Sequence, residues 1–177
     1  MDAGADMKDP GSEQRERFIG LLKAEGRHSI LEIGTGPGMD GLRFVRAGIH
    51  YTGVDLSEEN VHRARSRGLD VSVASARQLP FVDGTFPAAW AMNRVQHIPF
   101  GEIDGVLREL VRVTAPGAPI AVGLWSDENE ERVQQVFGHH GAIEEFLAWQ
   151  EVAGAESGPG AGIWTQHYQF LILRNPS

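Results

Sequence analysis

Cysteine is absent from the 177 residues of this chain. Without it there can be no disulfide framework, no thiolate metal site and no thiol nucleophile. Long apolar runs are absent too, and no segment reaches the roughly 20 residues that a membrane-spanning helix needs. Residues 1–11 carry aspartates and no apolar core, so no signal peptide is expected. We therefore expect a cytoplasmic protein with no membrane partner.

An excess of basic charge is also missing. The chain has 16 Lys and Arg against 24 Asp and Glu, which gives a formal net charge of −8. Phosphate binding needs clustered basic residues, so no nucleic-acid partner is expected. The basic cluster at Arg63, Arg65 and Arg67 is interpreted as a solvated helix face rather than an anion site. His139 and His140 are adjacent and would point apart on a helix, so no metal site is predicted.

The length and composition are those of one globular domain. Hydrophobic residues make up 41% of the chain and charged residues 23%, which is ordinary for such domains. We expect a flexible tail at 1–11 and a single domain at 12–177. In that domain the sequence motifs occupy 30–124. A strand pair at 142–173 encloses a flexible loop at 153–162, which is nearly all Ala, Gly, Ser and Pro.

Helical and strand patterns alternate along the domain. Helices are predicted at 12–25, between the glycines of 34–38 and Gly48, from a Ser57 cap to Gly68, and at 101–113 and 128–137. Strands are predicted at 30–33, 50–54, 69–73, 88–92, 120–125, 143–151 and 168–173. This order indicates an α/β sheet that is parallel over five strands and antiparallel at one edge.

The most informative segment is the first predicted strand with the turn after it, Ile30-Leu31-Glu32-Ile33-Gly34-Thr35-Gly36-Pro37-Gly38. The apolar start is typical of a strand covered on both faces. The glycines lack a Cβ, so the turn can lie very close to a ligand. A strand, a glycine turn and a helix form half of a nucleotide-binding crevice at the carboxyl end of a parallel strand.

The glycine spacing narrows the choice of nucleotide. A dinucleotide fingerprint has Gly at the first, third and sixth positions of its turn, and the sixth position here is Met39. A P-loop ends in Gly-Lys-Ser/Thr, which nothing in this turn supplies. A nicotinamide-dependent reductase is therefore disfavoured.

Three further motifs follow in order. The second predicted strand ends in an acid, then comes a turn-rich link, and a helix leads to a Pro-Gly turn before the fifth strand. The motifs are Gly53-Val54-Asp55-Leu56-Ser57, then Leu79-Pro80-Phe81 with Asp83-Gly84-Thr85-Phe86, then Leu107-Arg108-Glu109-Leu110 with Pro116-Gly117. With the first motif, over roughly 30–124, the sequence resembles class I S-adenosylmethionine-dependent methyltransferases of the small-molecule, type 11/25-like group.

This resemblance implies a Rossmann-like, doubly wound, mostly parallel seven-stranded sheet with an antiparallel edge strand and helices on both faces. It also implies S-adenosyl-L-methionine as the cofactor. Asp55 would accept hydrogen bonds from both ribose hydroxyls, Leu56 would pack on the adenine, and Glu32 would lie behind the glycine turn. The implied cofactor-binding residues are Glu32, Gly34, Thr35, Gly36, Pro37, Gly38, Asp55, Leu56, Ser75, Ala76, Arg77, Asn93, Arg94 and Val95.

Two residues depart from the pattern of the family. Ser75 stands where an Asp often binds the exocyclic amine of the adenine. A hydroxyl accepts this bond more weakly, which shifts adenine recognition toward backbone groups of Ala76 and Arg77. Pro87 follows Phe86 where the family often has Asp, and we expect only a structural consequence.

The acceptor side is less clearly marked. His97 matches a His common in the family, and it is either a general base for the acceptor or a half-buried residue that orients its loop. Methyl transfer from a sulfonium can rest on positioning alone, so no base is obligatory. Five residues either line an aromatic acceptor pocket or pack in the core: Trp125, Trp149, Trp164, His167 and Tyr168.

A small-molecule acceptor is expected by elimination. After Asn93 the sequence lacks the Asn/Asp-Pro-Pro-Tyr/Phe signature of DNA amino-methylation, and it also lacks the double-carboxylate loop of protein-arginine enzymes. Two functions stay open: methyl transfer by in-line displacement, and a catalytically silent cofactor-binding module that regulates or scaffolds a partner. With little chain before the core, residues 1–18 cover the site, or it is open, or a second subunit covers it in a homodimer.

Overall fold

In a computed structural model of the protein, the strands form one sheet in the order β3-β2-β1-β4-β5-β7-β6. The structure describes residues 11–92, 99–125, 128–153 and 164–176. The strands are β1 (Ser29–Ile33), β2 (His50–Asp55), β3 (Val71–Val73), β4 (Ala89–Met92), β5 (Pro119–Trp125), β6 (Ala142–Ala153) and β7 (Trp164–Arg174).

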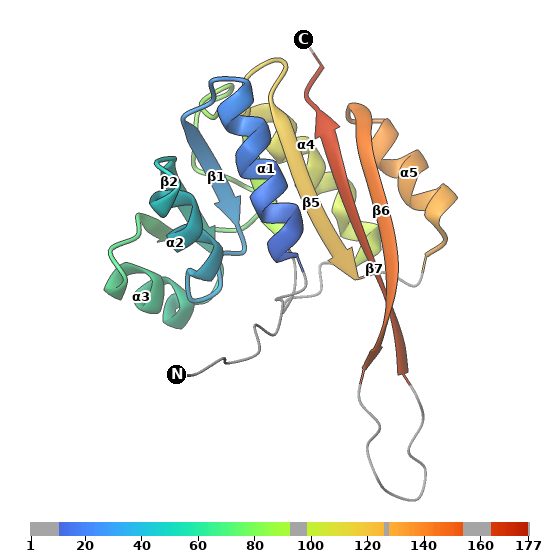
Figure 1. Ribbon diagram of the computed structural model, residues 1–177, viewed down its shortest axis with the longest axis horizontal. Coiled ribbons are helices and arrows are strands. Elements are labelled where there is room, and N and C mark those ends of the chain that lie inside the picture. Colours follow the sequence, from blue (N-terminus) through green and yellow to red (C-terminus); the bar gives the residue numbers. More distant parts are fainter. Residues whose placement is uncertain (1–10, 93–98, 126–127, 154–163, 177) are drawn as a thin grey trace, which may run out of the picture.

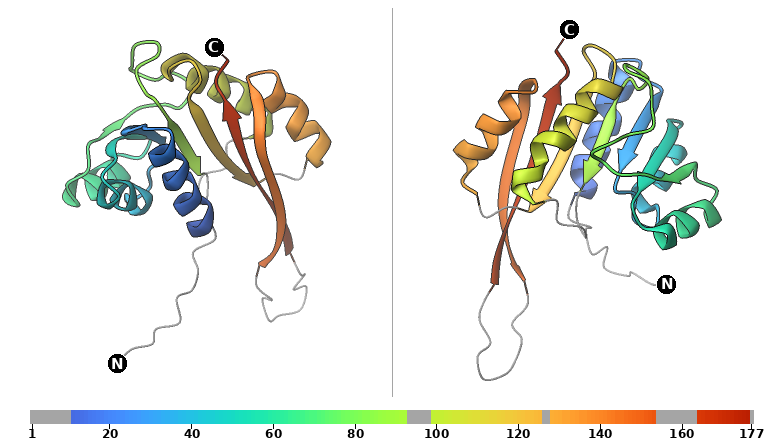
Figure 2. Two further views of the ribbon diagram at one scale, coloured as in Figure 1. Left: turned by 45° about the horizontal axis from the view of Figure 1, so that its top comes forward. Right: turned by 180° about the vertical axis from the view of Figure 1, so that it is seen from behind.

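Helices cover both faces of this sheet, as Figures 1 and 2 show. One face carries α1 (Ser12–Ala24), α2 (Met39–Arg46) and α3 (Glu58–Ser66). The other carries α4 (Ile103–Val113), preceded by the 3-10 turn η1 (Phe100–Glu102), and α5 (Glu130–Gly138). The first five strands pair in parallel, and β7 is antiparallel to both β5 and β6. The predicted Rossmann-like fold is confirmed, with the antiparallel strand one place in from the edge strand β6.

Alternate side chains of the strands fill two separate hydrophobic cores, one on each face. On the α1–α3 face, the fully buried Trp90 of β4 is the centre of a ring cluster. Its ring centroid lies 5.2 Å from Phe18, 5.6 Å from Phe44 and 6.0 Å from Phe170. This face therefore ties α1, α2 and β7 to the central strand that ends beside the glycine turn.

The predicted elements are found, and the largest shift is at β7. This strand begins at Trp164 rather than at Tyr168, because its pairing with β6 continues past the end of β5. Trp125, the last residue of β5, pairs with Tyr168, and the register of β6 and β7 runs on to Ala153 and Trp164. The hairpin therefore projects beyond the carboxyl ends of the parallel strands (Figure 1).

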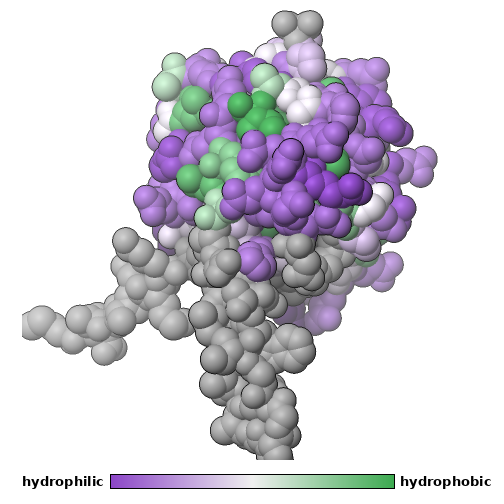
Figure 3. Space-filling view, turned by 90° about the vertical axis from the view of Figure 1, so that its right-hand side faces the viewer, coloured by the Kyte–Doolittle hydropathy of each residue, from purple (hydrophilic) through white to green (hydrophobic). Residues whose placement is uncertain are grey.

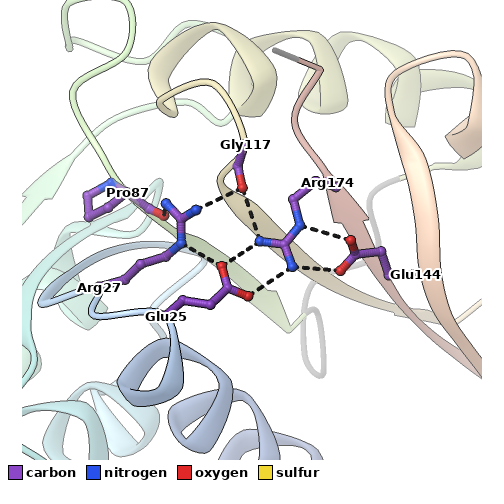
Figure 4. Close-up of polar contacts among 6 residues, drawn as sticks. All are labelled: Glu25, Arg27, Pro87, Gly117, Glu144 and Arg174. Carbon is purple, nitrogen blue, oxygen red and sulfur yellow. Dashed lines mark hydrogen bonds and ion pairs between the residues drawn. The ribbon is translucent and has the colours of Figure 1, made fainter.

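A charged network lies at the amino ends of the parallel strands, opposite the end where the hairpin projects (Figure 4). The Glu25 carboxylate accepts from Arg27 Nε at 2.8 Å and from Arg174 Nη1 and Nη2 at 2.6 and 2.9 Å. Both guanidinium groups also donate to the Gly117 carbonyl at 3.0 Å, and Arg174 reaches Glu144 of β6 at 2.7 Å. The end of α1 is thereby linked to the starts of β1 and β5 and to the β6–β7 hairpin.

The side formed by β6 and α5 is largely hydrophilic, with separate small hydrophobic groups (Figure 3). Glu144 and Glu145 lie on the edge strand, and Glu145 pairs with Arg17 of α1 at 2.7 Å. Charged side chains on an edge strand disfavour pairing with another sheet. None of the described helices is long and apolar enough to cross a bilayer.

Candidate functional site

The glycine turn joins β1 to α2 and contains three left-handed backbone positions. Gly34, Gly36 and Gly38 have φ angles of 72°, 54° and 97°, which side-chain-bearing residues rarely adopt. A Cβ on Gly34 or Gly36 would meet nothing within 4 Å, whereas one on Gly38 would lie 2.5 Å from Leu69 Cδ1. The first two glycines therefore border open space, and the third lets α2 pack closely against the chain that follows α3.

Asp55, at the carboxyl end of β2, is held by the backbone on both sides. Its Oδ2 accepts from the Gly36 N–H at 2.9 Å and its Oδ1 from the Ser57 N–H at 2.8 Å. The residue is only 3% exposed. The Asn60 amide also donates to Oδ1, at 3.5 Å. A carboxylate has about four acceptor positions, so this one retains capacity for a hydroxyl donor of a ligand. The adjacent Leu56 is 62% exposed, an apolar side chain in solvent beside a fixed carboxylate.

Thr35 contributes to the shape of the turn. Its side chain is buried against Gly53, where a Cβ would come within 2.5 Å of the Thr35 methyl group. Its hydroxyl donates to the Gly36 carbonyl at 3.0 Å, and its N–H donates to the Val54 carbonyl at 3.3 Å. Pro37, the other non-glycine residue of the turn, is partly exposed.

Glu32, in β1 two residues before the first glycine of the turn, is 2% exposed. It accepts a hydrogen bond from the hydroxyl of Tyr51 in β2. Burial, and then the negative charge of Glu32, raise the pKa of Tyr51 well above its ordinary value. The sequence analysis missed Tyr51, because a Tyr within an apolar strand gives no signal beyond core packing.

An apolar cavity opens at the carboxyl ends of β1, β2, β4 and β5. Gly34, Asp55, Leu56 and Ala76 belong to its wall, so residues from two predicted motifs and from the predicted adenine-binding segment 75–77 converge there. The remaining wall is apolar apart from backbone, and comprises Ile33, Val54, Ala74, Ala91, Ile103, Val106, Val122, Gly123 and Leu124. A ligand with an apolar part and one polar, hydroxyl-bearing part suits this lining.

Ser75 and Arg77 flank the cavity rather than line it. The Ser75 hydroxyl oxygen accepts from the Arg77 N–H at 3.2 Å and so caps the turn after β3. The Arg77 guanidinium, 59% exposed, pairs with Glu102 of η1 at 3.3 Å. This pair spans from the turn that carries Ala76 to the start of α4.

Two residues of α4 clamp the link between β3 and β4. Arg112 donates to the carbonyls of Leu79 and Phe81 at 2.9 and 2.8 Å, and Glu109 accepts from the Leu79 N–H at 2.7 Å. Glu109 and Arg112 also bond each other at 2.7 Å. Two sequence motifs, the turn-rich link and the 107–110 helix motif, are thus one structural unit.

The sequence analysis also missed a network of polar side chains that holds the start of α2. Asp40, in the first turn of α2, accepts from Arg15 Nη1 of α1 at 2.7 Å and from Trp90 Nε1 of β4 at 3.0 Å. Arg15 is 6% exposed, so this ion pair is buried. The network fixes the start of α2, and with it the glycine turn, against α1 and the sheet.

Four predicted residues, Asn93, Arg94, Val95 and His97, lie outside the described part of the chain. Of the predicted aromatic set, Trp125 and Tyr168 pack together with ring centroids 4.7 Å apart. The Tyr168 hydroxyl donates to the sulfur of Met92 at 3.3 Å. It passes over Gly123, where a Cβ would lie 2.0 Å from the hydroxyl oxygen. These rings therefore pack against the ends of β4 and β5.

Comparison with known proteins supplies the family. A model of the methyltransferase domain family matches residues 30–117, the stretch that holds the glycine turn, Asp55 and the α4 clamp. The chain belongs to the class I S-adenosylmethionine-dependent methyltransferases. This confirms the resemblance drawn from the sequence motifs.

Two curated methyltransferases are similar to this family member. One is the 27-O-demethylrifamycin SV methyltransferase of Amycolatopsis mediterranei, 30% identical over 69% of this chain and 47% of that protein. The other is the 24-methylenesterol C-methyltransferase 2 of Oryza sativa subsp. japonica, 30% identical over 70% of this chain and 38% of that protein. The chain thus spans less than half the length of these relatives.

The fold of this methyltransferase family member also recurs among solved structures. One is an N-methyltransferase of Haemonchus contortus, solved with phosphomonomethylethanolamine and S-adenosylhomocysteine. It has a TM-score of 0.70 and 16% identity, covering 94% of this chain and 54% of that one. At this identity the likeness shows the shared fold.

Proposed function

We propose that this domain binds S-adenosylmethionine at the carboxyl ends of β1 and β2 and transfers its methyl group to a small-molecule acceptor. One observation carries the proposal. The Asp55 carboxylate is fixed by two backbone N–H groups beside a glycine turn that borders open space and an exposed Leu56. This combination offers a ribose acceptor, a close backbone surface and an apolar platform within one site.

The residues present fit the parts of this cofactor. Asp55 retains acceptor positions for the ribose hydroxyls, and Leu56 and Ala76 supply apolar surface for the adenine. Gly34 and Gly36 leave room for the amino-acid tail because neither carries a side chain. Ser75 offers a neutral hydroxyl, whose oxygen also accepts from the Arg77 N–H, in place of a carboxylate, so adenine recognition would rely more on shape and backbone groups.

When bound, the cofactor would supply a methyl group on a sulfonium, and a nucleophile that attacks the methyl carbon in line would displace the neutral thioether, a good leaving group. The protein then has to hold the acceptor close to the methyl group and to exclude water. Such positioning can supply much of the rate acceleration. The Glu109–Arg112 clamp and the Asp40 network keep the link after β3 and the glycine turn in place for this purpose. His97 is assigned as a candidate base, with positioning alone as the alternative.

A small-molecule acceptor is supported by the apolar lining of the cavity and by the similar curated proteins, whose names specify a rifamycin and a sterol acceptor. Those two names specify O- and C-methylation, so they do not select the acceptor atom. We keep the expectation of no nucleic-acid partner as part of the proposal, with a homodimer as one of the three alternatives for covering the site.

Titration calorimetry with S-adenosylhomocysteine tests the cofactor site. We predict binding to the full chain, and a loss of about 10- to 100-fold in affinity for Asp55→Asn, because hydrogen bonds to a charged group contribute about 1.5–3 kcal/mol. Asp70→Asn is the matched control, since Asp70 is an exposed carboxylate outside the cavity wall. Equal affinities for the wild type and Asp55→Asn, or binding of NADH in place of S-adenosylhomocysteine, would contradict the proposal.

Turnover separates the two functions left open by the sequence. Production of S-adenosylhomocysteine from S-adenosylmethionine is measured with a panel of phenols, alcohols, amines and carbon acids. An acceptor-dependent signal that Asp55→Asn lowers supports the methyltransferase. Tight binding of S-adenosylhomocysteine without turnover on any member of the panel would instead favour the silent regulatory or scaffold module.

A further inference from the structure

A groove lies between α1 and the β6–β7 hairpin, on the face of the sheet that α1 covers (Figure 1). Its volume is about 350 Å³, which is within the usual size range of small-molecule sites. Among the described residues, it shares no wall residue with the cavity at the carboxyl ends of the strands. A ligand of this groove would therefore bind apart from the proposed cofactor site.

The floor of the groove is apolar and held in place by the core. It is formed by Phe170 and Ile172 of β7, which are 1% and 5% exposed, and Leu21 of α1 borders it. The Phe170 ring belongs to the cluster around Trp90, with 6.0 Å between the ring centroids. Close packing in the core leaves these side chains little freedom to turn and fill the groove. The groove therefore offers a preformed surface for an apolar ligand.

An ion pair connects the two sides of the groove. Arg17 Nη1 of α1 lies 2.7 Å from Glu145 Oε1 of β6, and both residues belong to the wall. The two charges neutralise each other, so the wall favours a neutral ligand over an ion. A helix or strand laid along the groove would have to break this pair. A small molecule therefore suits the groove better than a segment of a protein partner.

One polar side chain of the wall contains an unpaired atom. The side-chain oxygen of Gln14 is buried, and no group in the described part of the chain donates a hydrogen bond to it. Leaving a buried acceptor unpaired costs stability, and such atoms are few in native proteins. An N–H or O–H group of a ligand would satisfy this oxygen. The apolar floor and the unpaired acceptor thus specify two parts of the ligand.

We propose that the groove between α1 and the β6–β7 hairpin is a second binding site, for a small neutral molecule with an apolar body and one N–H or O–H donor. The apolar body packs on Phe170, Ile172 and Leu21, and the donor bonds the Gln14 oxygen. This site goes beyond the proposed methyl transfer and does not depend on it.

Two probes isolate the donor. Indole has a flat apolar body with one N–H group, and N-methylindole has the same rings without that donor. In titrations of the isotopically labelled full chain followed by NMR, we expect indole to shift the amide signals of Gln14, Leu21 and Phe170. Saturating S-adenosylhomocysteine should leave these shifts in place, because the two sites are separate. The affinity for N-methylindole should be about three- to tenfold lower, the usual effect of one neutral hydrogen bond.

Three variants test the assignment of the wall residues. Gln14→Met keeps a side chain of similar length without the amide, so it should weaken indole about three- to tenfold and leave N-methylindole within about twofold. Leu21→Trp places a larger ring beside the floor and should abolish binding of both probes. Lys23→Met, at an exposed position of α1 outside the wall, is the matched control and should change neither affinity.

The inference is overturned if indole shifts no amide of the groove, if S-adenosylhomocysteine displaces it, or if N-methylindole binds the wild type as tightly as indole. Equal weakening of both probes by Gln14→Met would also overturn it. Sedimentation of the wild type and of Leu21→Trp tests for another occupant, because a dimer that only this variant loses would make the groove a subunit interface. Should Gln14→Met fail to fold, the ratio of the two probe affinities in the wild type still decides.

Discussion

At the scale of single residues, the three glycines of the turn have separate tasks. All three need a left-handed backbone, but only Gly38 is crowded, by Leu69. Gly34 and Gly36 border open space, where a ligand would lie. Identical residues in one motif therefore differ in their surroundings, one packed and two beside the space of the proposed ligand, which the motif by itself does not reveal.

This division predicts different outcomes for two alanine substitutions. Gly34→Ala should cost about 1–2 kcal/mol of stability from its left-handed φ and should also abolish S-adenosylhomocysteine binding, because the added methyl group enters the ligand space. Gly38→Ala should cost at least as much stability, from its φ and the contact with Leu69, while the folded protein keeps most of its affinity. Urea denaturation and calorimetry measure the two effects. Loss of binding by Gly38→Ala alone would contradict this assignment.

At the scale of elements, α4 does more than cover the sheet. Its apolar face packs on β1, β4 and β5, and its polar edge holds the backbone between β3 and β4 through Glu109 and Arg112. That link contains no helix or named strand, and its position is set by these side-chain bonds together with backbone bonds from the Gly84 and Phe86 N–H groups to the Arg112 and Val113 carbonyls at 2.8 and 2.9 Å. The cavity wall at Ala76 is thus positioned by a helix that lies some thirty residues away in the sequence.

Removing the clamp should loosen the link without unfolding the sheet. In Arg112→Met, we expect the Leu79 amide to exchange with solvent hydrogen at least about tenfold faster, because Glu109 loses the guanidinium that orients it. Hydrogen exchange by mass spectrometry or NMR measures this. Arg108→Met, an exposed position on the same helix, is the control and should leave the Leu79 rate unchanged. Equal rates in both variants would exclude the clamp.

At the scale of the whole molecule, the two ends of the parallel strands carry different kinds of residues. At the carboxyl ends an apolar cavity opens, while at the amino ends charged side chains form the Glu25–Arg27–Arg174–Glu144 network (Figure 4). This network connects the first helix with the last strand, so it holds together parts that are far apart in the sequence. The proposed ligand would bind at the strand ends opposite this network.

Low pH should weaken the charged network at the amino ends of the strands, and with it the stability of the fold. Hydrogen bonds from Arg174, and then from Arg27, lower the pKa of Glu25 from 4.5 to about 2 in the folded protein. A depressed folded-state pKa contributes stability above the unfolded value, and this contribution is lost as pH falls from about 4.5 to about 2. The wild type should therefore be more stable than Glu25→Gln at pH 7, with the difference shrinking through that window. Urea midpoints at several pH values measure it, and a difference that stays constant down to pH 3 would contradict the role of Glu25.

Much of this protein could be read from local sequence. Gly34, Gly36 and Gly38 indicated a turn close to a ligand, Asp55 marked the end of β2, and Ser57 marked the cap of α3, where it accepts from the Asn60 N–H. These features depend on backbone conformation and hydrophobic period, which neighbouring residues set. The order of motifs was enough to identify the family before any contact was known.

Long-range contacts could not be read in this way. Tyr51 bonds Glu32 across two strands, Arg15 reaches Asp40 across two helices, and Arg174 reaches Glu25 across most of the chain. No local period or spacing encodes such pairs, because they arise only when the sheet brings distant elements together. The sequence by itself determined the fold class and the family, since turns and strand ends are local and their order is set by the chain. Only the tertiary structure decided which side chains hold the turn, since buried polar groups take their partners from whatever packs against them.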